Sequence, residues 1–189
     1  MMILNAMIRT LLSLLLALQT PIMGTGSRKI FTANSQGPFT ATVVTASWTN
    51  PNNAETCNGT FASTNILANA NSSSMKLTGF GFSIPNLATI SGITATIKHQ
   101  AFSGNLKDQS VQLTKAGTPS GSDKANPSLW LTGSVETFSY GSSFDLWGQA
   151  WAPSDINNSG FGLNLVVHNT DSISRSAGID CVTITVAYQ

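Results

Sequence analysis

The chain has 189 residues, of which only 9% are charged, against roughly 25% in most soluble proteins, so its solubility must come from uncharged polar residues. Residues 1–34 carry three basic residues and no acid, whereas the remainder carries six basic and eight acidic residues, a balance of −2. Because phosphate binding needs several clustered Lys or Arg, the lack of a basic stripe argues against a nucleic-acid partner.

Residues 1–35 are expected to form an apolar arm or helix and a linker that precede the folded domain. Arg9 comes before the apolar run Leu11–Leu18, and small and polar residues follow, which is the order found in secretory signals. No clean cleavage site follows the run, and it falls short of the roughly 20 apolar residues of a membrane span. Three interpretations stay open: a signal-like segment, a membrane anchor, or an apolar helix that assembles on a neighbouring subunit.

Residues 36–189 are expected to form one domain. Short segments rich in β-branched residues recur at roughly ten-residue spacing, separated by turn residues. The expected strands are residues 40–48, 60–68, 74–82, 92–102, 106–115, 134–140, 161–169 and 178–188, with a polar loop at 118–127 and one helical turn at 153–158. This pattern predicts an all-β fold, a single antiparallel β-sandwich that is jelly-roll-like.

The side chains expected to be buried change from one face of the chain to the other near Gly79 and Gly81. Met75 and Leu77 alternate with polar residues before the glycines, whereas Phe80 falls on the opposite set of positions. A bulge at the glycines would account for the change, since glycine within a strand often marks one.

Aromatic residues are concentrated in residues 134–165 and just before them. Trp147 and Trp151 lie among glycines and apolar strand residues, which favours a place in the core. Trp130 follows a polar loop and stands between Leu129 and Leu131. Three consecutive apolar residues there either plug one end of the sandwich or face a partner, so Trp130 is the candidate for a partner or glycan contact.

No motif points to catalysis, a metal or a cofactor. His99 lies on the apolar row of its strand and is expected to be hydrogen-bonded or placed at the rim, while His168 is expected in a solvated loop. Neither shows ligand spacing for zinc with Cys57 or Cys181, and no nucleophile elbow occurs. We therefore expect a protein that is not an enzyme and holds no cofactor.

The acidic residues are too few to predict a glycosidase, which needs two convergent carboxylates. Asp155 fits the first turn of the short helix, and Asp123 fits its Gly- and Ser-rich loop. Asp108 is interpreted as an exposed residue at the start of a strand.

The two cysteines could close one disulfide across most of the domain. Such a bond requires the Cα atoms of Cys57 and Cys181 to lie within about 7 Å, which the sequence alone does not determine. Two separate, half-buried thiols are the alternative.

Seven short motifs stand in a fixed order and together cover about residues 46–188. They are WTNPNNA (48–54), LTGFGFSIP (77–85), ISGI (90–93), DQSVQL (108–113), YGSSFDLWG (140–148), DINNSGFG (155–162) and IDCVTITVAY (179–188). As an ordered set they resemble a family of small β-sandwich proteins and domains encoded by tailed bacteriophages and bacterial prophages. Cys57, Cys181 and the apolar N-terminal run depart from the family pattern.

The resemblance implies a virion or tail-associated structural protein without known catalysis, and it transfers no functional residues. We therefore expect a non-enzymatic bacteriophage virion protein, such as a capsid decoration, tail or fibre appendage. It would assemble through its N-terminal arm with other virion subunits, as a homo-oligomer such as a trimer. The alternative is a secreted or tail-tip module that binds carbohydrate or another host-surface component through Trp130.

Overall fold

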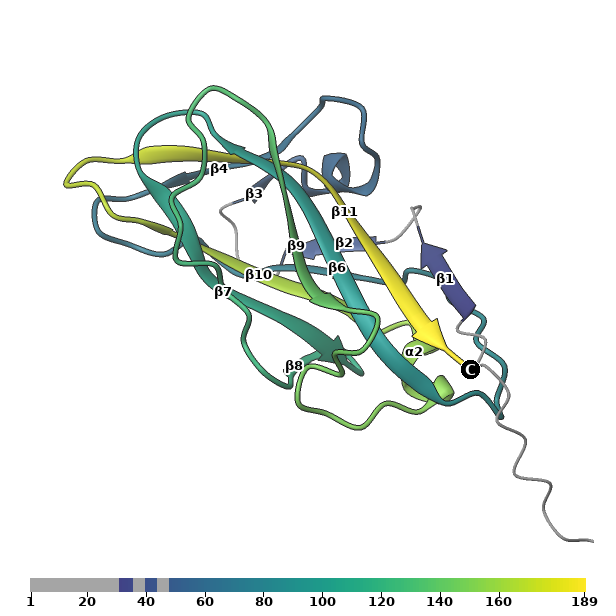
Figure 1. The fold of residues 1–189 in the computed structure, drawn as a ribbon. Coiled ribbons are helices and arrows are strands. Elements are labelled where there is room, and N and C mark those ends of the chain that lie inside the picture. The colour runs from purple at the N-terminus through teal and green to yellow at the C-terminus, as the bar shows by residue number, and fades with distance from the viewer. Residues whose placement is uncertain (1–30, 36–39, 44–47) are drawn as a thin grey trace, which may run out of the picture.

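The computed structural model describes residues 31–35, 40–43 and 48–189, which form two antiparallel β-sheets packed face to face (Figure 1). The elements are β1 (Phe31–Ser35), β2 (Thr40–Val43), β3 (Trp48–Thr49), the 3-10 helix η1 (Pro51–Glu55), β4 (Ala62–Ile66), β5 (Met75–Thr78), β6 (Ile90–Ala101), β7 (Leu106–Lys115), β8 (Thr118–Ser120), β9 (Glu136–Ser142), α2 (Pro153–Ile156), β10 (Gly162–Asn169) and β11 (Arg175–Tyr188). The expected all-β antiparallel sandwich is confirmed.

Most neighbouring strands within each sheet are distant in the sequence. One sheet has the order β3-β4-β11-β6-β9, with β1 also paired to β11, and the other has the order β2-β5-β10-β7-β8. The two long strands at the centre of the first sheet, β6 and β11, pair over nearly their whole length, from Ala177↔Ala101 to Tyr188↔Ile90. They set the long axis of the molecule.

The core lies between the sheets and is filled by the inward rows of the strands. Alternate positions of β6 and β10, such as Ile93, Ile97, Leu163 and Leu165, are fully buried, as the period of two in a half-buried strand requires. Trp147 is also fully buried, and its Nε1 atom donates a hydrogen bond to the carbonyl oxygen of Ile93 at 2.8 Å. The predicted core positions of Trp147 and Trp151 are confirmed.

The segment around Gly79 and Gly81 changes its buried face as predicted, but not through a bulge. β5 ends at Thr78, and both glycines then adopt a positive φ, of 81° and 71°. This left-handed backbone, which glycine adopts without steric cost, turns Phe80 and Phe82 into the core after Met75 and Leu77. The bulge interpretation is therefore wrong, because the strand stops before the glycines.

The N-terminal boundary of the sandwich differs from the expected one. β1 lies within residues 1–35, the segment expected to precede the domain, yet it pairs with β11 in the register Phe31↔Tyr188 to Ser35↔Ile184. The expected strand 40–48 is divided between β2 and β3, which belong to different sheets. The expected arm or helix in residues 1–30 lies outside the described residues. Within the described ranges, no helix is long and apolar enough to cross a membrane.

The sandwich has two distinct ends. At the end that we call proximal, Phe31 pairs with Tyr188 and the chain reaches its C-terminus (Figure 1). At the opposite end, which we call distal, lie the β4–β5, β6–β7 and β10–β11 loops and the last part of the β8–β9 loop, residues 129–135. The chain that precedes Phe31 therefore joins the sandwich at the proximal end.

Candidate functional site

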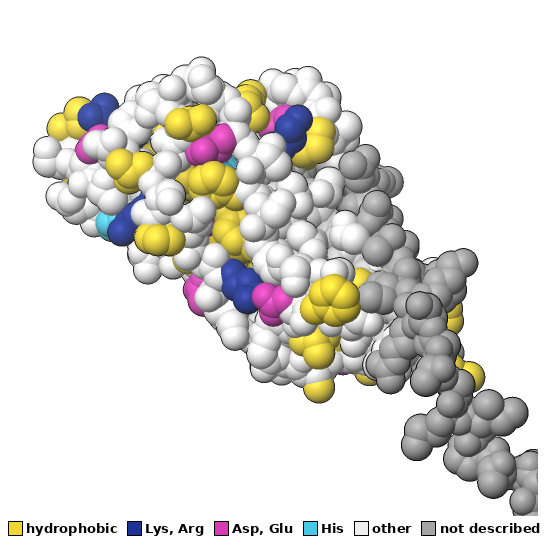
Figure 2. All heavy atoms as spheres, in the orientation of Figure 1, with side chains coloured by type: hydrophobic (Ala, Val, Ile, Leu, Met, Phe, Trp, Pro, Cys, Tyr) yellow, Lys and Arg dark blue, Asp and Glu magenta, His cyan; other side chains and the backbone are white. Residues whose placement is uncertain are grey.

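The exposed hydrophobic side chains of the described residues are concentrated at the distal end. Of eight large exposed hydrophobic residues, six lie there, and Leu87 and Phe144 lie in proximal loops. The six are Leu67 (67% exposed), Phe102 (39%), Leu129 (50%), Leu131 (53%), Val135 (45%) and Ile173 (57%), and we call them the distal apolar surface. Figure 2 shows hydrophobic side chains dispersed among polar atoms along the whole of the face in view. Single exposed apolar residues are common on protein surfaces, so what distinguishes these six is that they share one end of the sandwich.

Leu129 and Leu131 are exposed because Trp130 between them is buried. The Trp130 side chain is only 3% exposed, and its backbone nitrogen donates to the carbonyl oxygen of Leu106 at 2.8 Å. The carbonyl oxygen of Leu131 accepts from Ala101 at 3.0 Å, so the segment runs extended across the ends of β7 and β6. Alternate side chains of an extended chain point to opposite sides. The exposed position expected for Trp130 is thus wrong, and the end-plug alternative is confirmed.

Asp108 holds Trp130 in place from beneath. Its Oδ1 atom accepts a hydrogen bond from Trp130 Nε1 at 3.0 Å, and its Oδ2 atom accepts from the Tyr140 hydroxyl at 2.7 Å and from the Asn126 backbone at 2.8 Å. Burial raises the pKa of Asp108 above its ordinary value, and these three hydrogen bonds oppose the rise. Asp108 is only 4% exposed, so its interpretation as an exposed strand start is wrong. The carboxylate connects β7, the β8–β9 loop and β9.

His99 packs on the other side of the Trp130 ring. The two ring centroids are 4.0 Å apart, and the Phe138 ring lies nearly perpendicular to that of His99, with centroids 4.7 Å apart. Burial lowers the pKa of His99 to about 3, so the imidazole is neutral near pH 7. Neither ring nitrogen has a hydrogen-bond partner among the described residues. The expected hydrogen-bonded or rim position of His99 is therefore wrong: the ring serves as part of the aromatic core.

Glu136 connects this aromatic cluster to the exposed loop. Its Oε1 atom accepts a hydrogen bond from the Leu131 backbone nitrogen at 2.6 Å and lies 3.7 Å from His99 Nδ1. The Thr132 hydroxyl donates to the carbonyl oxygen of Gly104 at 2.9 Å. These contacts fix the backbone that presents Leu129 and Leu131.

The other distal loops are also fixed by side-chain hydrogen bonds. The Asn169 side-chain nitrogen lies 2.9 Å from the carbonyl oxygen of Leu67 and 2.8 Å from that of Ile173. Asp171 accepts hydrogen bonds from the backbone and side chain of Asn105 and pairs with Arg175. Because binding costs free energy for every loop that must be ordered, loops that are already fixed favour association.

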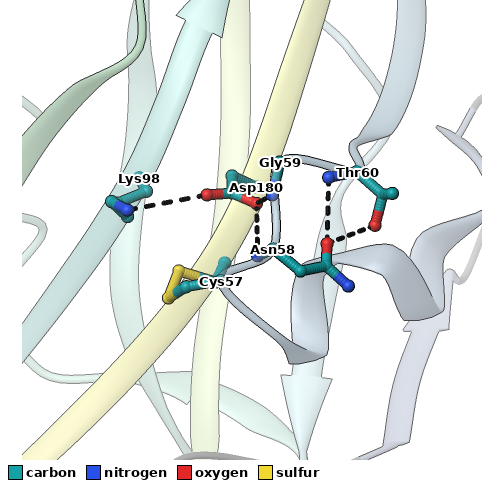
Figure 3. Close-up of a disulfide and its surroundings, with 7 residues drawn as sticks. Cys57, Asn58, Gly59, Thr60, Lys98 and Asp180 are labelled. Atoms are coloured by element: carbon teal, nitrogen blue, oxygen red, sulfur yellow. Dashed lines mark hydrogen bonds and ion pairs between the residues drawn. A yellow bond between two sulfur atoms is a disulfide. The ribbon is translucent and has the colours of Figure 1, made fainter.

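Cys57 and Cys181 form a disulfide, with Cα atoms 4.9 Å apart, so the alternative of two separate thiols is wrong (Figure 3). Next to it, Asp180 lies at an irregularity in the pairing of β11 with β6. Its Oδ1 atom accepts from the backbone nitrogens of Asn58 and Gly59 at 3.2 and 2.8 Å, and its Oδ2 atom lies 3.8 Å from Lys98 Nζ. Together these contacts fasten the loop between η1 and β4 to β11.

The remaining candidates for chemistry have structural partners. Asp155 accepts from the Ala152 backbone at the start of α2, and Asp123 accepts from the Val111 and Ala125 backbones, as the sequence suggested. His168 Nδ1 lies 2.7 Å from Asn71 Oδ1. Within the part of the chain that the structure describes, no group of three His, Cys, Asp or Glu residues could hold a metal ion. Asp123, Asp155 and His168 thus contact other groups of the fold itself.

Comparison of the sequence with protein-family models and with curated proteins finds no match. Among solved structures, the chain is similar at 12% identity to one described as "CBM4 structure and function", over 81% of this chain and 92% of that chain, with a TM-score of 0.41. It is similar, also at 12% identity, to the N-terminal cellulose-binding domain of a β-1,4-glucanase C from Cellulomonas fimi (87% and 90% covered, TM-score 0.35). A third similar structure, also at 12% identity, is the tripod from the baseplate of bacteriophage Tuc2009. The similarity covers 85% of this chain and 62% of that chain, with a TM-score of 0.34. With every TM-score below 0.5, these similarities assign neither a family nor a function.

Proposed function

We propose that this chain is a non-enzymatic structural subunit of a bacteriophage particle, which joins neighbouring virion subunits through its N-terminal segment. The observation that carries the proposal is the placement of two apolar features at opposite ends of one sandwich. The N-terminal segment, with its apolar run Leu11–Leu18, joins the sandwich at the proximal end, and the distal apolar surface lies at the other end. A subunit with an apolar element at each end suits assembly into a larger structure.

Two further features support this proposal. The ordered motifs between residues 48 and 188 resemble small β-sandwich proteins of tailed bacteriophages and prophages. The disulfide between Cys57 and Cys181 suits a protein exposed outside the cytoplasm, since disulfides persist mainly in oxidising surroundings. We place the protein on the virion exterior for these reasons.

The alternative of a carbohydrate-binding module depended on Trp130 as the stacking platform. A sugar ring needs an exposed aromatic face, and the Trp130 ring is covered by His99 and bonded to Asp108. No other observation favours glycan binding over subunit contact, so we do not pursue this alternative.

The test is incorporation into particles. The full-length chain and a variant with Leu12→Asp and Leu15→Asp are produced with an epitope tag during phage or prophage growth, and particles are purified on a density gradient. We expect the full-length protein in the particle fraction and the variant only in the soluble fraction. A full-length protein that never co-purifies with particles, although it is folded and abundant, contradicts the proposal.

A further inference from the structure

We infer that the distal apolar surface binds the apolar run Leu11–Leu18 of a second copy of this chain, so that copies join end to end. The inference rests on the proposed function, in which the N-terminal segment is the joining element, and it names the neighbour and the receiving surface.

The chemistry of the two partners matches. The run Leu11–Leu18 contains six leucines, one alanine and one serine and carries no charge. The distal apolar surface is likewise made of aliphatic residues and one phenylalanine. The acids beside it already have partners. Glu136 accepts a hydrogen bond from the Leu131 backbone, and Asp171 accepts one from Asn105 and forms an ion pair with Arg175. Joining the surfaces therefore buries apolar side chains beside acids that already have partners.

Net charge does not oppose the contact. Residues 1–34 carry +3 and the rest of the chain −2, which together give the formal net charge of +1. The N-terminal segment of one copy therefore approaches a domain of the opposite sign. The attraction between them is weak, but two surfaces of like charge would repel each other instead.

The reach of the chain favours a second copy over the same copy. β11 runs the length of the sandwich with 14 residues, or roughly 45 Å, from Arg175 at the distal end to Tyr188 beside Phe31. Thirteen residue steps separate Leu18 from Phe31, so only a fully stretched chain, also about 45 Å, would reach its own distal surface. Unconstrained chains of this length average about 20 Å from end to end. A neighbour placed end to end presents its distal surface within that shorter distance.

The contact joins two different surfaces, and this determines the symmetry. Each copy gives its N-terminal run to one neighbour and receives a run from another, which is a heterologous interface. Such an interface closes into a ring when the rotation between copies permits it and otherwise forms a filament. A trimer, the expected oligomer, is then a closed ring of three rather than a threefold bundle of N-terminal segments.

The experiment uses two full-length variants that each lack one half of the contact. The run variant carries Leu12→Asp and Leu15→Asp, and the surface variant carries Leu131→Asp and Ile173→Asp. A control variant, Leu87→Asp, places one aspartate on an exposed proximal residue. Molar mass is measured by size-exclusion chromatography with light scattering, and intact mass spectrometry verifies that residues 1–23 are retained.

We expect oligomers from the unaltered chain and from Leu87→Asp, and monomers from either double variant alone. Mixed in equal amounts, the two double variants should form dimers and stop there, because only one run and one intact surface remain to pair. Monomers in the mixture, or oligomers from the surface variant alone, would overturn the inference, as would removal of residues 1–23 from the mature chain.

Two precautions keep the outcomes separate. If the surface variant loses its near-ultraviolet circular dichroism, the milder pair Leu131→Ser and Ile173→Ser replaces it, with the same dimer expected. The mixing result is obtained with purified protein and does not depend on particles. Incorporation into particles without dimers in the mixture rejects the end-to-end contact alone, and dimers without incorporation reject the virion role alone.

Discussion

The Oδ1 atom of Asp108 accepts a hydrogen bond from Trp130 Nε1 at 3.0 Å, although 22 residues separate the two in the sequence. Both side chains are buried, so this bond fastens the loop that presents Leu129 and Leu131 to strand β7. The distal apolar surface thus depends on a polar contact in the interior.

Replacement of Asp108 by alanine should destabilise the fold strongly. The change leaves three donors without their acceptor, the Trp130 indole, the Tyr140 hydroxyl and the Asn126 backbone. Each buried unsatisfied group costs about 1–3 kcal/mol, so we expect the free energy of unfolding to fall by about 2–5 kcal/mol. Urea denaturation measures the change, and Thr137→Ala, at an exposed position of β9, is the control. A loss below about 1 kcal/mol would contradict the assigned role.

Replacement of Trp130 by phenylalanine should lower stability while keeping the chain folded. The smaller ring still packs on His99 but cannot donate to Asp108, and we expect a loss of about 1–3 kcal/mol. Trp130→Ala should cost about 3–5 kcal/mol, because it also leaves a cavity. Chemical denaturation of both variants checks the order of the two effects. Unchanged stability together with a lost ligand contact would instead restore Trp130 as a surface residue.

His99 should make the protein sensitive to acid. Its pKa is lowered from 6.5 to about 3 in the folded state, so the unfolded chain takes up a proton first as the pH falls. The contribution of His99 to stability is complete above pH 6.5 and is lost progressively towards pH 3. The slope approaches about 1.4 kcal/mol per pH unit in that window.

The measurement for His99 is the free energy of unfolding between pH 4 and 8, compared with that of His99→Leu. We expect the difference between the two proteins to change with pH in the direction that favours the leucine variant at low pH. Asp108, whose pKa is raised, acts in the opposite sense in both proteins and cancels in the comparison. Parallel pH curves for the two proteins would contradict a buried neutral His99.

Loss of the disulfide should destabilise the sandwich without altering its fold. The bond joins residues 124 positions apart, and in the chain-entropy treatment such a cross-link contributes about 2–5 kcal/mol. We expect the melting temperature to fall when a reducing agent is added. The double variant Cys57→Ser, Cys181→Ser should melt at the lower temperature with or without reductant. Equal melting temperatures for the oxidised and reduced protein would show that the Asp180 contacts suffice to hold the loop.

The strands with a clear local pattern were predictable from the sequence. β10 and β11 are rich in Val, Ile and Thr and follow the expected ranges closely, because such residues suit a pleated, half-buried surface. β8 was expected to be part of a loop, because Thr118–Ser120 opens the polar stretch 118–127 and contains Pro119. Proline is tolerated there because β8 is an edge strand. No local pattern distinguishes such a short edge strand from a polar loop.

The site was less predictable, because its contacts are distant in the sequence. The triplet Leu129, Trp130, Leu131 implies that the tryptophan and the leucines point to opposite sides of the chain. It does not reveal which of the two sides faces solvent. The partner that decides it is Asp108, which resembles any charged residue near the start of a strand. Only the folded structure shows that the Asp108 side chain is buried.

The pairing of β1 with β11 has a mechanical consequence for a subunit held by its N-terminal segment. β1 lies antiparallel to β11 over five residue pairs, and its first residue, Phe31, lies at the proximal end. A pull on the segment along the long axis, resisted at the distal end, loads these backbone hydrogen bonds in shear, so they share the force instead of breaking one after another. If β1 does detach, the Cys57–Cys181 bond stops the extension at residue 57. Drag on the subunit would therefore draw out only the chain before residue 57, while the strands from β4 onward stay paired.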